Sequence, residues 1–360
     1  MARPTQAIIN LQHLKENYQL AKGHSQKAYA VVKANAYGHG AIAIAQALVE
    51  ADGFAVACMD EALELRHQGI QKPILVLEGA FDKEEWLAAV EHDIEMTVHH
   101  QSQLDILLNE PCFKQLKLWL KIDTGMNRLG FRLAESSSVF DQCRHAGLDI
   151  KVLMSHFACA DELNKDKTLI QFQALTDILE QQTVFWPELI LSSNNSAAII
   201  AWPKVCDNIS RPGIMLYGSS PLVSHSANTV SLKPVMTLTS KIISSHIVNA
   251  GESIGYAESW VANQTTRVGI VAIGYGDGYP RSAPSGTPVW CNNRRLKTLG
   301  RVAMDMLCID ITDQDDIDIG AEVELWGENI NANDIADRCN TISYELFCQL
   351  TPRVKRVYET

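Results

Sequence analysis

Short apolar runs rich in β-branched residues recur through the first two thirds of the chain. Each is followed by a segment in which apolar residues stand three and four positions apart, as in 41–51 and 60–69. Such runs predict buried strands, and such segments predict amphipathic helices. The predicted strands are 28–34, 54–59, 73–77, 94–98, 116–122, 150–155, 189–193 and 209–216. Eight strands alternating with helices predict an α/β fold with an N-terminal (β/α)8 barrel of the TIM type.

A second pattern begins after residue 232, where β-rich runs are separated by Gly, Pro and Asn. It predicts strands at 235–248, 268–274, 289–291, 306–311 and 323–326, and one helix near 332–339. We therefore expect a barrel domain over 1–232 and a mostly antiparallel C-terminal β domain over 233–360, with 224–231 as the linker. A dinucleotide-binding sheet is a weaker alternative, because no Gly-x-Gly-x-x-Gly loop opens the first helix.

Composition narrows the classes of partner. The 31 Lys and Arg residues against 42 Asp and Glu give a net charge of −11, which argues against a nucleic-acid binder. The N-terminal residues lack the apolar core of a signal peptide, and no 18 apolar residues occur in a row, so a cytoplasmic protein without a membrane partner is expected. Nine cysteines without a Cys-x-x-Cys pair predict reduced thiols and no metal site.

Candidate chemistry lies at the carboxyl ends of the barrel strands, where enzymes of this fold carry their active sites. Lys33 directly follows the apolar pair Val31-Val32 at the end of the first strand. Burial there favours the neutral, nucleophilic form of an amine, which a Schiff-base lysine needs. Taken alone, the position is explained at least as well by a lysine that extends from the barrel rim into solvent.

The ends of strands seven and eight are the usual phosphate site of this fold. They offer the hydroxyl of Ser196 and the backbone amides of Gly213 and Ile214. Taken separately, 195–196 is also explained as a helix N-cap and 211–213 as a turn. Together with the lysine at the end of strand one, these groups indicate a phosphorylated aldehyde cofactor bound to an amine.

Eight sequence blocks, in order along nearly the whole chain, resemble those of alanine racemases. Residues 31–40, Val-Val-Lys-Ala-Asn-Ala-Tyr-Gly-His-Gly, resemble the pyridoxal-phosphate attachment motif of that family. The other blocks are 121–130, 155–158, 195–198, 211–218, 273–280, 300–306 and 342–345. The resemblance implies an amino-acid racemase that uses pyridoxal 5'-phosphate and interconverts L- and D-alanine, for peptidoglycan or for D-alanine catabolism.

The same resemblance implies a two-base mechanism in a homodimer with shared active sites. Lys33 holds the cofactor as an aldimine and serves one face of the substrate Cα, while Tyr275 of the partner subunit serves the other face. His156 couples that tyrosine to Arg211. Considered alone, His156 is also explained as a structural barrel histidine and Tyr275 as an aromatic residue in a turn.

Further roles follow from the matching motifs. Arg211 corresponds to the arginine at the pyridine nitrogen, Arg128 to the residue at the cofactor phenolic oxygen and substrate carboxylate, and Met304 of the partner subunit to a backbone donor for that carboxylate. The cofactor-binding set is Lys33, Tyr37, Arg128, His156, Asn195, Ser196, Arg211, Gly213, Ile214 and Tyr344. A core position remains an alternative for Tyr344. Lys121 matches a lysine that some members carbamylate, and an ordinary lysine paired with a carboxylate is the alternative.

Three other functions use the same cofactor on a related fold. A broad-specificity amino-acid racemase is the main alternative. A barrel amino-acid decarboxylase would need an acidic or cysteine substrate-binding motif in the β domain, and none is found. A single-domain pyridoxal-phosphate-binding protein would lack the residues beyond 232 altogether.

Overall fold

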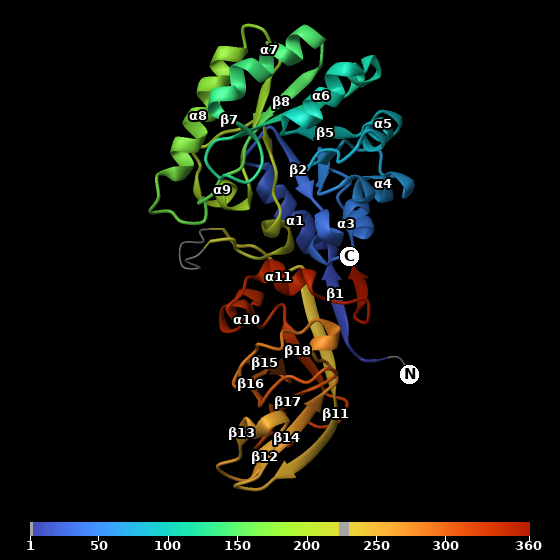
Figure 1. Cartoon of the computed structure of the whole chain (residues 1–360). Helices are drawn as coiled ribbons and strands as arrows, with labels where there is room; N and C mark the ends of the chain where they lie inside the picture. Colours follow the sequence, from blue (N-terminus) through green and yellow to red (C-terminus); the bar gives the residue numbers. More distant parts are fainter. Residues whose placement is uncertain (1–2, 223–229) are drawn as a thin grey trace.

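A nearly closed parallel sheet forms the centre of the upper part of the molecule in Figure 1. The structure is a computed structural model that describes residues 3–222 and 230–360. Its strand order is β10-β2-β3-β4-β5-β6-β8-β9, and every neighbouring pair is parallel. The strands are β2 (Lys27–Val31), β3 (Gly53–Val56), β4 (Ile74–Val76), β5 (Glu95–Val98), β6 (Leu118–Asp123), β8 (Ile150–Met154), β9 (Ile190–Ser192) and β10 (Ile209–Ser210). The barrel predicted from the sequence is confirmed.

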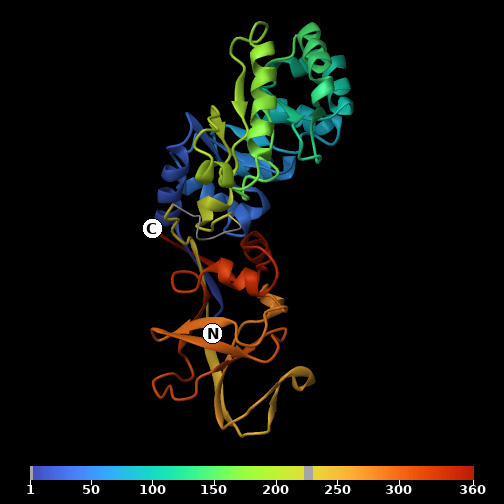
Figure 2. The same ribbon diagram turned by 90° about the vertical axis from the view of Figure 1, so that its left-hand side faces the viewer.

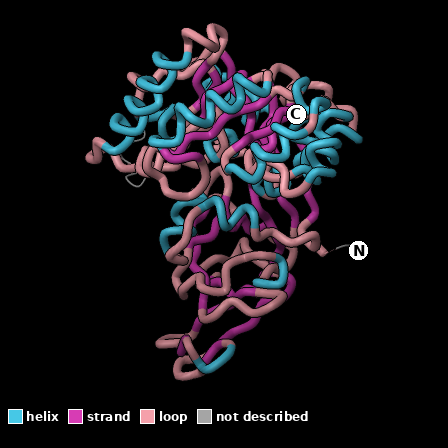
Figure 3. The backbone as a smooth tube through the Cα atoms, turned by 45° about the horizontal axis from the view of Figure 1, so that its top comes forward, coloured by secondary structure: helices cyan, strands magenta, loops and turns pink. Residues whose placement is uncertain are grey.

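Helices surround this sheet on the outside, as Figure 3 shows. They are α1 (Leu11–Lys22), α3 (Ala41–Ala47), α4 (Met59–His67), α5 (Lys83–Glu91), α6 (Gln101–Asn109), α7 (Ser136–Ala146), α8 (Lys167–Gln182) and α9 (Ser196–Ala201). All six residues of β6 are buried, as expected for a strand covered on both faces. Between β9 and β10 the Asn208 amide donates to the Leu191 carbonyl (3.1 Å), and the Arg211 amide donates to Asn194 (2.8 Å). These bonds complete the circuit of the barrel.

The predicted ends of the first and last barrel strands are wrong. β2 ends at Val31, and residues 34–37 form a left-handed turn within the short segment α2 (Lys33–Tyr37). β10 contains only Ile209–Ser210, and the apolar run that follows is a 3-10 helix, η3 (Ile214–Tyr217). Pro212 has no N–H for a strand ladder, which is a physical reason for β10 to stop before it.

The lower part of Figure 1 is built on a mostly antiparallel sheet, as predicted. Its order is β14-β17-β16-β15-β18-β11-β1-β19, with a further pairing between β14 and β11. The strands are β1 (Gln6–Asn10), β11 (Met236–Val248), β14 (Thr266–Val271), β15 (Pro288–Cys291), β16 (Arg294–Leu299), β17 (Leu307–Asp310), β18 (Glu322–Trp326) and β19 (Lys355–Glu359). A small hairpin of β12 (Ser253–Ile254) and β13 (Trp260–Val261) lies at the far end.

Strand β1 belongs to this second sheet although it precedes the barrel in the chain. It pairs antiparallel with β11 and parallel with β19. The first and last strands of the chain therefore lie side by side in one sheet.

The predicted linker 224–231 falls almost entirely outside the described residues.

Helices α10 (Ala332–Arg338) and α11 (Ser343–Cys348) lie between the second sheet and the barrel (Figures 1 and 2). α11 packs directly against α2 of the barrel. A Cβ at Gly38 would lie only 2.1 Å from the Phe347 carbonyl oxygen, and the φ of Gly38 is +77°. The Arg356 Nε donates to the Gly38 carbonyl at 3.0 Å. Glycine is therefore required at position 38 for the two parts to meet.

Among the described residues, no helix has both the length and the apolar character needed to cross a lipid bilayer.

His39 is buried where the segment after α2 meets α11, and this burial predicts a stability that depends on pH. Its Nδ1 donates to the Tyr37 carbonyl (2.9 Å) and its ring packs 4.5 Å from that of Tyr217. Burial lowers the pKa of His39 to about 4, from 6.5. Between these values the unfolded chain binds a proton that the folded chain does not, so the free energy of unfolding falls as pH falls.

We expect His39 alone to contribute a loss of about 3 kcal/mol between pH 6.5 and 4. His39→Gln keeps an N–H donor and cannot take up the proton, so its unfolding free energy should depend less on pH. Chemical denaturation of both proteins at pH 7, 6 and 5, at one protein concentration, measures the difference. Equal pH slopes would show that this histidine does not titrate on unfolding.

Candidate active site

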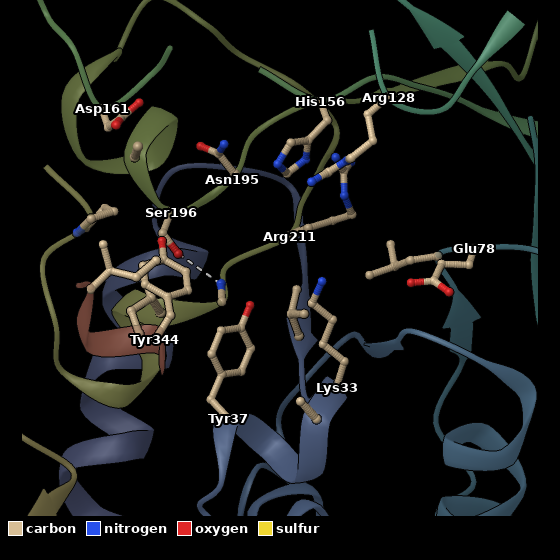
Figure 4. Close-up of a pocket in the computed structure, with 18 of the residues that line it drawn as sticks. Lys33, Tyr37, Glu78, Arg128, His156, Asp161, Asn195, Ser196, Arg211 and Tyr344 are labelled. Carbon is tan, nitrogen blue, oxygen red and sulfur yellow. Dashed lines mark hydrogen bonds between the residues drawn. The ribbon is translucent and has the colours of Figure 1, made fainter. Parts of the chain in front are cut away.

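A cavity of about 670 Å³ opens at the carboxyl ends of the barrel strands, beside α11. This volume is in the range typical of cofactor and small-molecule sites. Its walls include every cofactor-binding residue named from the sequence. These are Lys33, Tyr37, Arg128, His156, Asn195, Ser196, Arg211, Gly213, Ile214 and Tyr344. Figure 4 shows that side chains from separate parts of the chain point toward one space: Lys33 and Tyr37 from α2, Ser196 from α9, Arg211 from the segment after β10, and Tyr344 from α11.

Lys33 enters the cavity from the end of β2, just before an unusual backbone turn. Ala34, Asn35 and Ala36 have φ between 51° and 54°. A left-handed conformation costs about 1–2 kcal/mol for each residue that has a Cβ. Two side chains hold the turn. Glu61 accepts from the Ala34 amide (2.6 Å), and the Asn35 side chain accepts from the Ala41 amide (2.8 Å). Strain of this kind is typical of functional sites.

One corner of the cavity, beside α9 and η3, is formed by hydroxyl groups and a glycine. The Ser196 Oγ accepts from the Gly213 amide at 2.9 Å and lies 3.3 Å from the Met215 amide. A Cβ at Gly213 would lie 2.6 Å from the Tyr37 hydroxyl, so a larger residue there would displace that hydroxyl. Within the described residues, the hydroxyls of Tyr37 and Tyr344 make no hydrogen bond and are free to donate to a ligand.

Asn195 has the structural role that the sequence analysis gave as an alternative. Its side-chain oxygen accepts from the Ala198 amide at 3.0 Å, which caps α9. The same residue lines the cavity, so capping and cavity formation occur together. Tyr344 also lines the cavity, and it reaches the barrel because α11 packs on α2. Tyr344 also packs, partly buried, against the hydrophobic core, so the core position that the sequence analysis gave as an alternative occurs together with cavity lining.

Arg211 is buried at the centre of the site and held by two groups. Its Nη2 donates to the Ser155 carbonyl at 2.7 Å, and its Nη1 donates to the Ser192 hydroxyl. Burial lowers the pKa of Arg211 to about 10, and Asp207 partly opposes this. The guanidinium therefore remains protonated at neutral pH. It is fixed in orientation by its own strand neighbours.

Positive charge accumulates around Arg211. Burial, followed by the charges of Arg211, Arg128 and Lys33, lowers the pKa of Lys121 to about 8. Burial, and then the same cationic neighbours, lowers the pKa of His156 well below 6.5. His156 is therefore neutral at physiological pH. The cavity is suited to an anionic ligand, because among the described residues only Glu78 and Asp161 contribute carboxylates to its lining.

The loop after β6 carries Arg128 to the cavity. The Asp123 Oδ1 accepts from the amides of Gly125 (2.9 Å) and Asn127 (3.0 Å). The Asp123 Oδ2 pairs with Arg132 at 2.9 Å. Positive φ values at Gly125 and Asn127 turn the chain so that Arg128 faces the site.

Tyr275 and Met304 do not line this cavity. They lie in the β domain, with 38% and 52% of their surface exposed. The Tyr275 amide donates to the Ala303 carbonyl (3.0 Å), so the loops that carry the two residues are adjacent. Within one chain, the structure brings the cofactor-binding set together and leaves this pair apart from it.

Sequence reasoning missed a buried glutamine that connects three segments of the site. Gln171 of α8 donates to Thr124 and to the His156 carbonyl, both at 3.1 Å, and accepts from the Ala158 amide at 3.0 Å. No motif marks it, because its neighbours in the sequence form an ordinary helix. Asp207 was missed as well. Its carboxylate accepts from the amides of Ser193 and Asn194, both at 2.7 Å.

Comparisons with known proteins agree with this geometry. Family models of the N-terminal and C-terminal domains of alanine racemase match residues 9–221 and 235–358. The chain is 47% identical over 362 residues to an alanine racemase of Pseudomonas syringae, with 99% of each chain covered. It is 45% identical to a catabolic alanine racemase of Pseudomonas putida, with 99% of each covered.

Solved structures agree as well. The crystal structure of the biosynthetic alanine racemase from Pseudomonas aeruginosa matches with a TM-score of 0.94 and 42% identity, over 99% of this chain and all of that one. That of the alanine racemase from Acinetobacter baumannii matches with a TM-score of 0.93. The resemblance noted in the sequence is thereby confirmed. The chain belongs to the alanine racemase family, whose members are pyridoxal-phosphate-dependent isomerases.

Proposed function

We propose that this protein interconverts L- and D-alanine with pyridoxal 5'-phosphate, as a homodimer whose active sites each use both chains. The observation that carries the proposal is the single cavity in which the Lys33 amine, three hydroxyls and Arg211 meet. The alanine racemase relatives include biosynthetic and catabolic members. One reaction, the interconversion of L- and D-alanine, serves both roles: it supplies D-alanine for peptidoglycan, and it removes D-alanine in catabolism.

The residues present fit the phosphate of this cofactor. Tyr37, Ser196 and Tyr344 offer neutral hydroxyl donors, and Gly213 leaves room where a Cβ would meet the Tyr37 hydroxyl. Burial raises the pKa of both tyrosines, so they stay protonated and can donate. Neutral donors position a dianion without a full opposite charge. The backbone amide of Ile214, at the start of η3, is a further donor on this side.

Lys33 would hold the cofactor covalently, and Arg211 would meet its pyridine nitrogen. When bound, the cofactor supplies an electron-withdrawing ring that stabilises negative charge at the substrate Cα. Arg211 is protonated at neutral pH and only donates, so it would leave the ring nitrogen without a proton and make this stabilisation moderate. A moderate stabilisation suits a racemase, because the proton returns to Cα rather than to another carbon.

Racemisation needs a proton-transferring group on each face of Cα. We assign Lys33 to one face and Tyr275 of the partner subunit to the other. The exposure of Tyr275 in the single chain, away from its own cavity, supports a role toward a second chain. We propose that the neutral His156 accepts a hydrogen bond from the hydroxyl of that tyrosine. The positive charge of Arg211 acts on the same imidazole, because it lowers the pKa of His156.

The substrate carboxylate would be bound by Arg128 and by the backbone amide of Met304 of the partner subunit. Arg128 lies on the turn fixed by Asp123, which holds it at the cavity mouth. A guanidinium offers two parallel donors to a carboxylate. These contacts orient the substrate so that its Cα hydrogen faces one of the two bases.

We further propose the division at residue 232 and a cytoplasmic location. The family models end at 221 and resume at 235, on either side of the proposed boundary. All nine cysteines are free thiols, which is typical of a reducing compartment. The broad-specificity racemase and the decarboxylase remain alternatives that the first experiment below separates from alanine racemisation.

The first test follows alanine chirality with the pyridoxal-phosphate-loaded protein, starting from L-alanine and separately from D-alanine. Both reactions should converge on the same racemic mixture. Lys33→Ala should lower the rate by about 10³-fold or more, as expected for loss of a general base. Lys27→Ala changes an exposed lysine at the other end of the same strand and should leave the rate unchanged.

Release of carbon dioxide without racemisation would instead indicate a decarboxylase. Equal rates on L-serine and L-alanine would indicate a broad-specificity racemase. Absence of any conversion, with cofactor bound, would contradict the proposal.

Lys121 provides a second test. Its buried amine has no ion pair or hydrogen bond among the described residues, and its pKa of about 8 leaves much of it neutral in mild base. We propose that the neutral form of its Nζ adds carbon dioxide to form a carbamate, with release of one proton to solvent; starting from the ammonium form, two protons are released in all. The resulting anion would offset the surrounding positive charge and hold Arg128.

With ¹³C-bicarbonate, a protein-bound carbamate signal should appear in the ¹³C spectrum and grow as pH rises through about 8, because only the neutral amine reacts. Lys121→Ala should remove the signal and raise KM for alanine through a looser Arg128. Lys204→Ala, at an exposed lysine, should keep it. A spectrum without a carbamate signal at any pH from 7 to 9 would rule the modification out.

A further inference from the structure

Asp277, two residues after Tyr275 in the chain, carries a fully buried carboxylate. Asp277 ends the 3-10 turn η6 (Tyr275–Asp277), and its side chain is not exposed to solvent. The Asp277 Oδ2 accepts from the Gly274 amide at 3.0 Å and from the Arg3 Nη2 at 2.7 Å. The Asp277 Oδ1 lies 3.2 Å from the Arg353 Nε. Two cations from opposite ends of the chain therefore meet on one carboxylate.

Both arginines also reach the residue that follows Met304. The Arg353 Nη2 donates to the Asp305 carboxylate at 2.7 Å. The Arg3 Nη2 donates to the Asp305 carbonyl at 2.6 Å. Each arginine thus connects Asp277 with Asp305. We call these four residues, Arg3, Asp277, Asp305 and Arg353, the ion cluster.

The backbones of the loop that carries Tyr275 and the loop that carries Met304 are also in direct contact. The Gly276 amide donates to the Met304 carbonyl at 2.8 Å. A Cβ at Gly274 would lie 2.2 Å from the Ala303 carbonyl oxygen, and one at Gly276 would lie 2.5 Å from the Arg353 Nη1. Glycine is needed at position 274 so that the backbone of the Met304 loop can approach, and a larger residue at position 276 would displace the Arg353 side chain. The Tyr275 loop and the Met304 loop therefore form one unit.

We propose that the ion cluster positions Tyr275 and Met304 for the active site of the partner subunit. This inference rests on the proposed function, in which these two residues act on the substrate bound by the other chain. Arg3 and Arg353 are positioning residues here, because they touch neither the cavity nor Tyr275's hydroxyl in the described part of the chain. They fix the turn from which that side chain projects.

Stability alone is a poor explanation for such a cluster. Burying a carboxylate is costly, and well-packed apolar residues often serve a fold equally well or better. The cluster gives direction through its charged hydrogen bonds, from Arg3 to Asp277 and from Arg353 to Asp305, since such bonds have narrow geometry. Proton transfer at Cα requires that geometry, because a displacement of about 1 Å can cost 10²-fold in rate.

Arg3 and Arg353 are partly exposed to solvent, so the proposal can be tested by replacing them. Side chains of Arg3 and Arg353 are 30% and 41% exposed, so both can be replaced without opening the core. Arg353→Gln removes the charge that joins Asp277 to Asp305. Arg353→Lys keeps a cation near Asp277 but cannot bridge both carboxylates as the guanidinium does. Arg294→Gln breaks an exposed ion pair with Asp316 in the same domain and is the matched control.

The measurement is exchange of the Cα hydrogen of each alanine enantiomer with D₂O, beside kcat and KM for racemisation. Loss of a well-placed Tyr275 should stop racemisation while Lys33 still exchanges the Cα hydrogen of one enantiomer. We expect Arg353→Gln to lower kcat at least tenfold, change KM less, and retain exchange of only that enantiomer. Arg353→Lys should recover part of kcat, and Arg294→Gln should behave like the unaltered enzyme.

Tyr275→Phe separates failure of this inference from failure of the proposed function. If Tyr275→Phe itself racemises normally, the assignment of Tyr275 as a base is wrong. If Tyr275→Phe is inactive and Arg353→Gln is fully active, the ion cluster does not position the tyrosine. An equal loss of exchange for both enantiomers, or dissociation of the Arg353→Gln dimer in sedimentation, would likewise overturn the inference, because it would indicate general damage to the protein.

Discussion

Positive charge gathered around one cavity is the constraint on which this structure depends. Lys33, Lys121, Arg128 and Arg211 face the same space, and His156 stays neutral because those cations and its burial lower its pKa. Cations removed from water are costly unless an anion accompanies them. The proposed ligands, a phosphate and a carboxylate, supply that charge. The same positive charges therefore favour the binding of anionic ligands and determine which titratable groups of the site are protonated.

The fold meets this constraint by bringing distant residues to one end of a parallel barrel. Strands that run in the same direction end on the same side, so the lysine after β2, the arginine loop after β6 and the serine after β9 converge. The left-handed turn after Lys33 and the tight contact of α2 with α11 complete the wall. Local strain at the turn is supported by bonds from Glu61 and Asn35.

Sequence patterns predicted much of this because they report burial. Apolar runs located all eight barrel strands, and the predicted cofactor-binding residues lie together in the cavity, whereas Tyr275 and Met304 do not line it. The same patterns could not give pairing partners. β1 looks like any short strand, and only the structure shows it between β11 and β19. The apolar run after Pro212 packs as a 3-10 helix, since burial alone does not distinguish helix from strand. Gln171 acts through tertiary hydrogen bonds that no local motif records.

The central claim is that each active site takes its lysine from one chain and its tyrosine from the other. Mixing unfolded Lys33→Ala and Tyr275→Phe chains and refolding them together tests it most directly. Each mixed dimer would contain one intact site, so about a quarter of the normal activity should return if chains pair at random. If each chain carries its own complete site, the mixture will stay as inactive as its two parents.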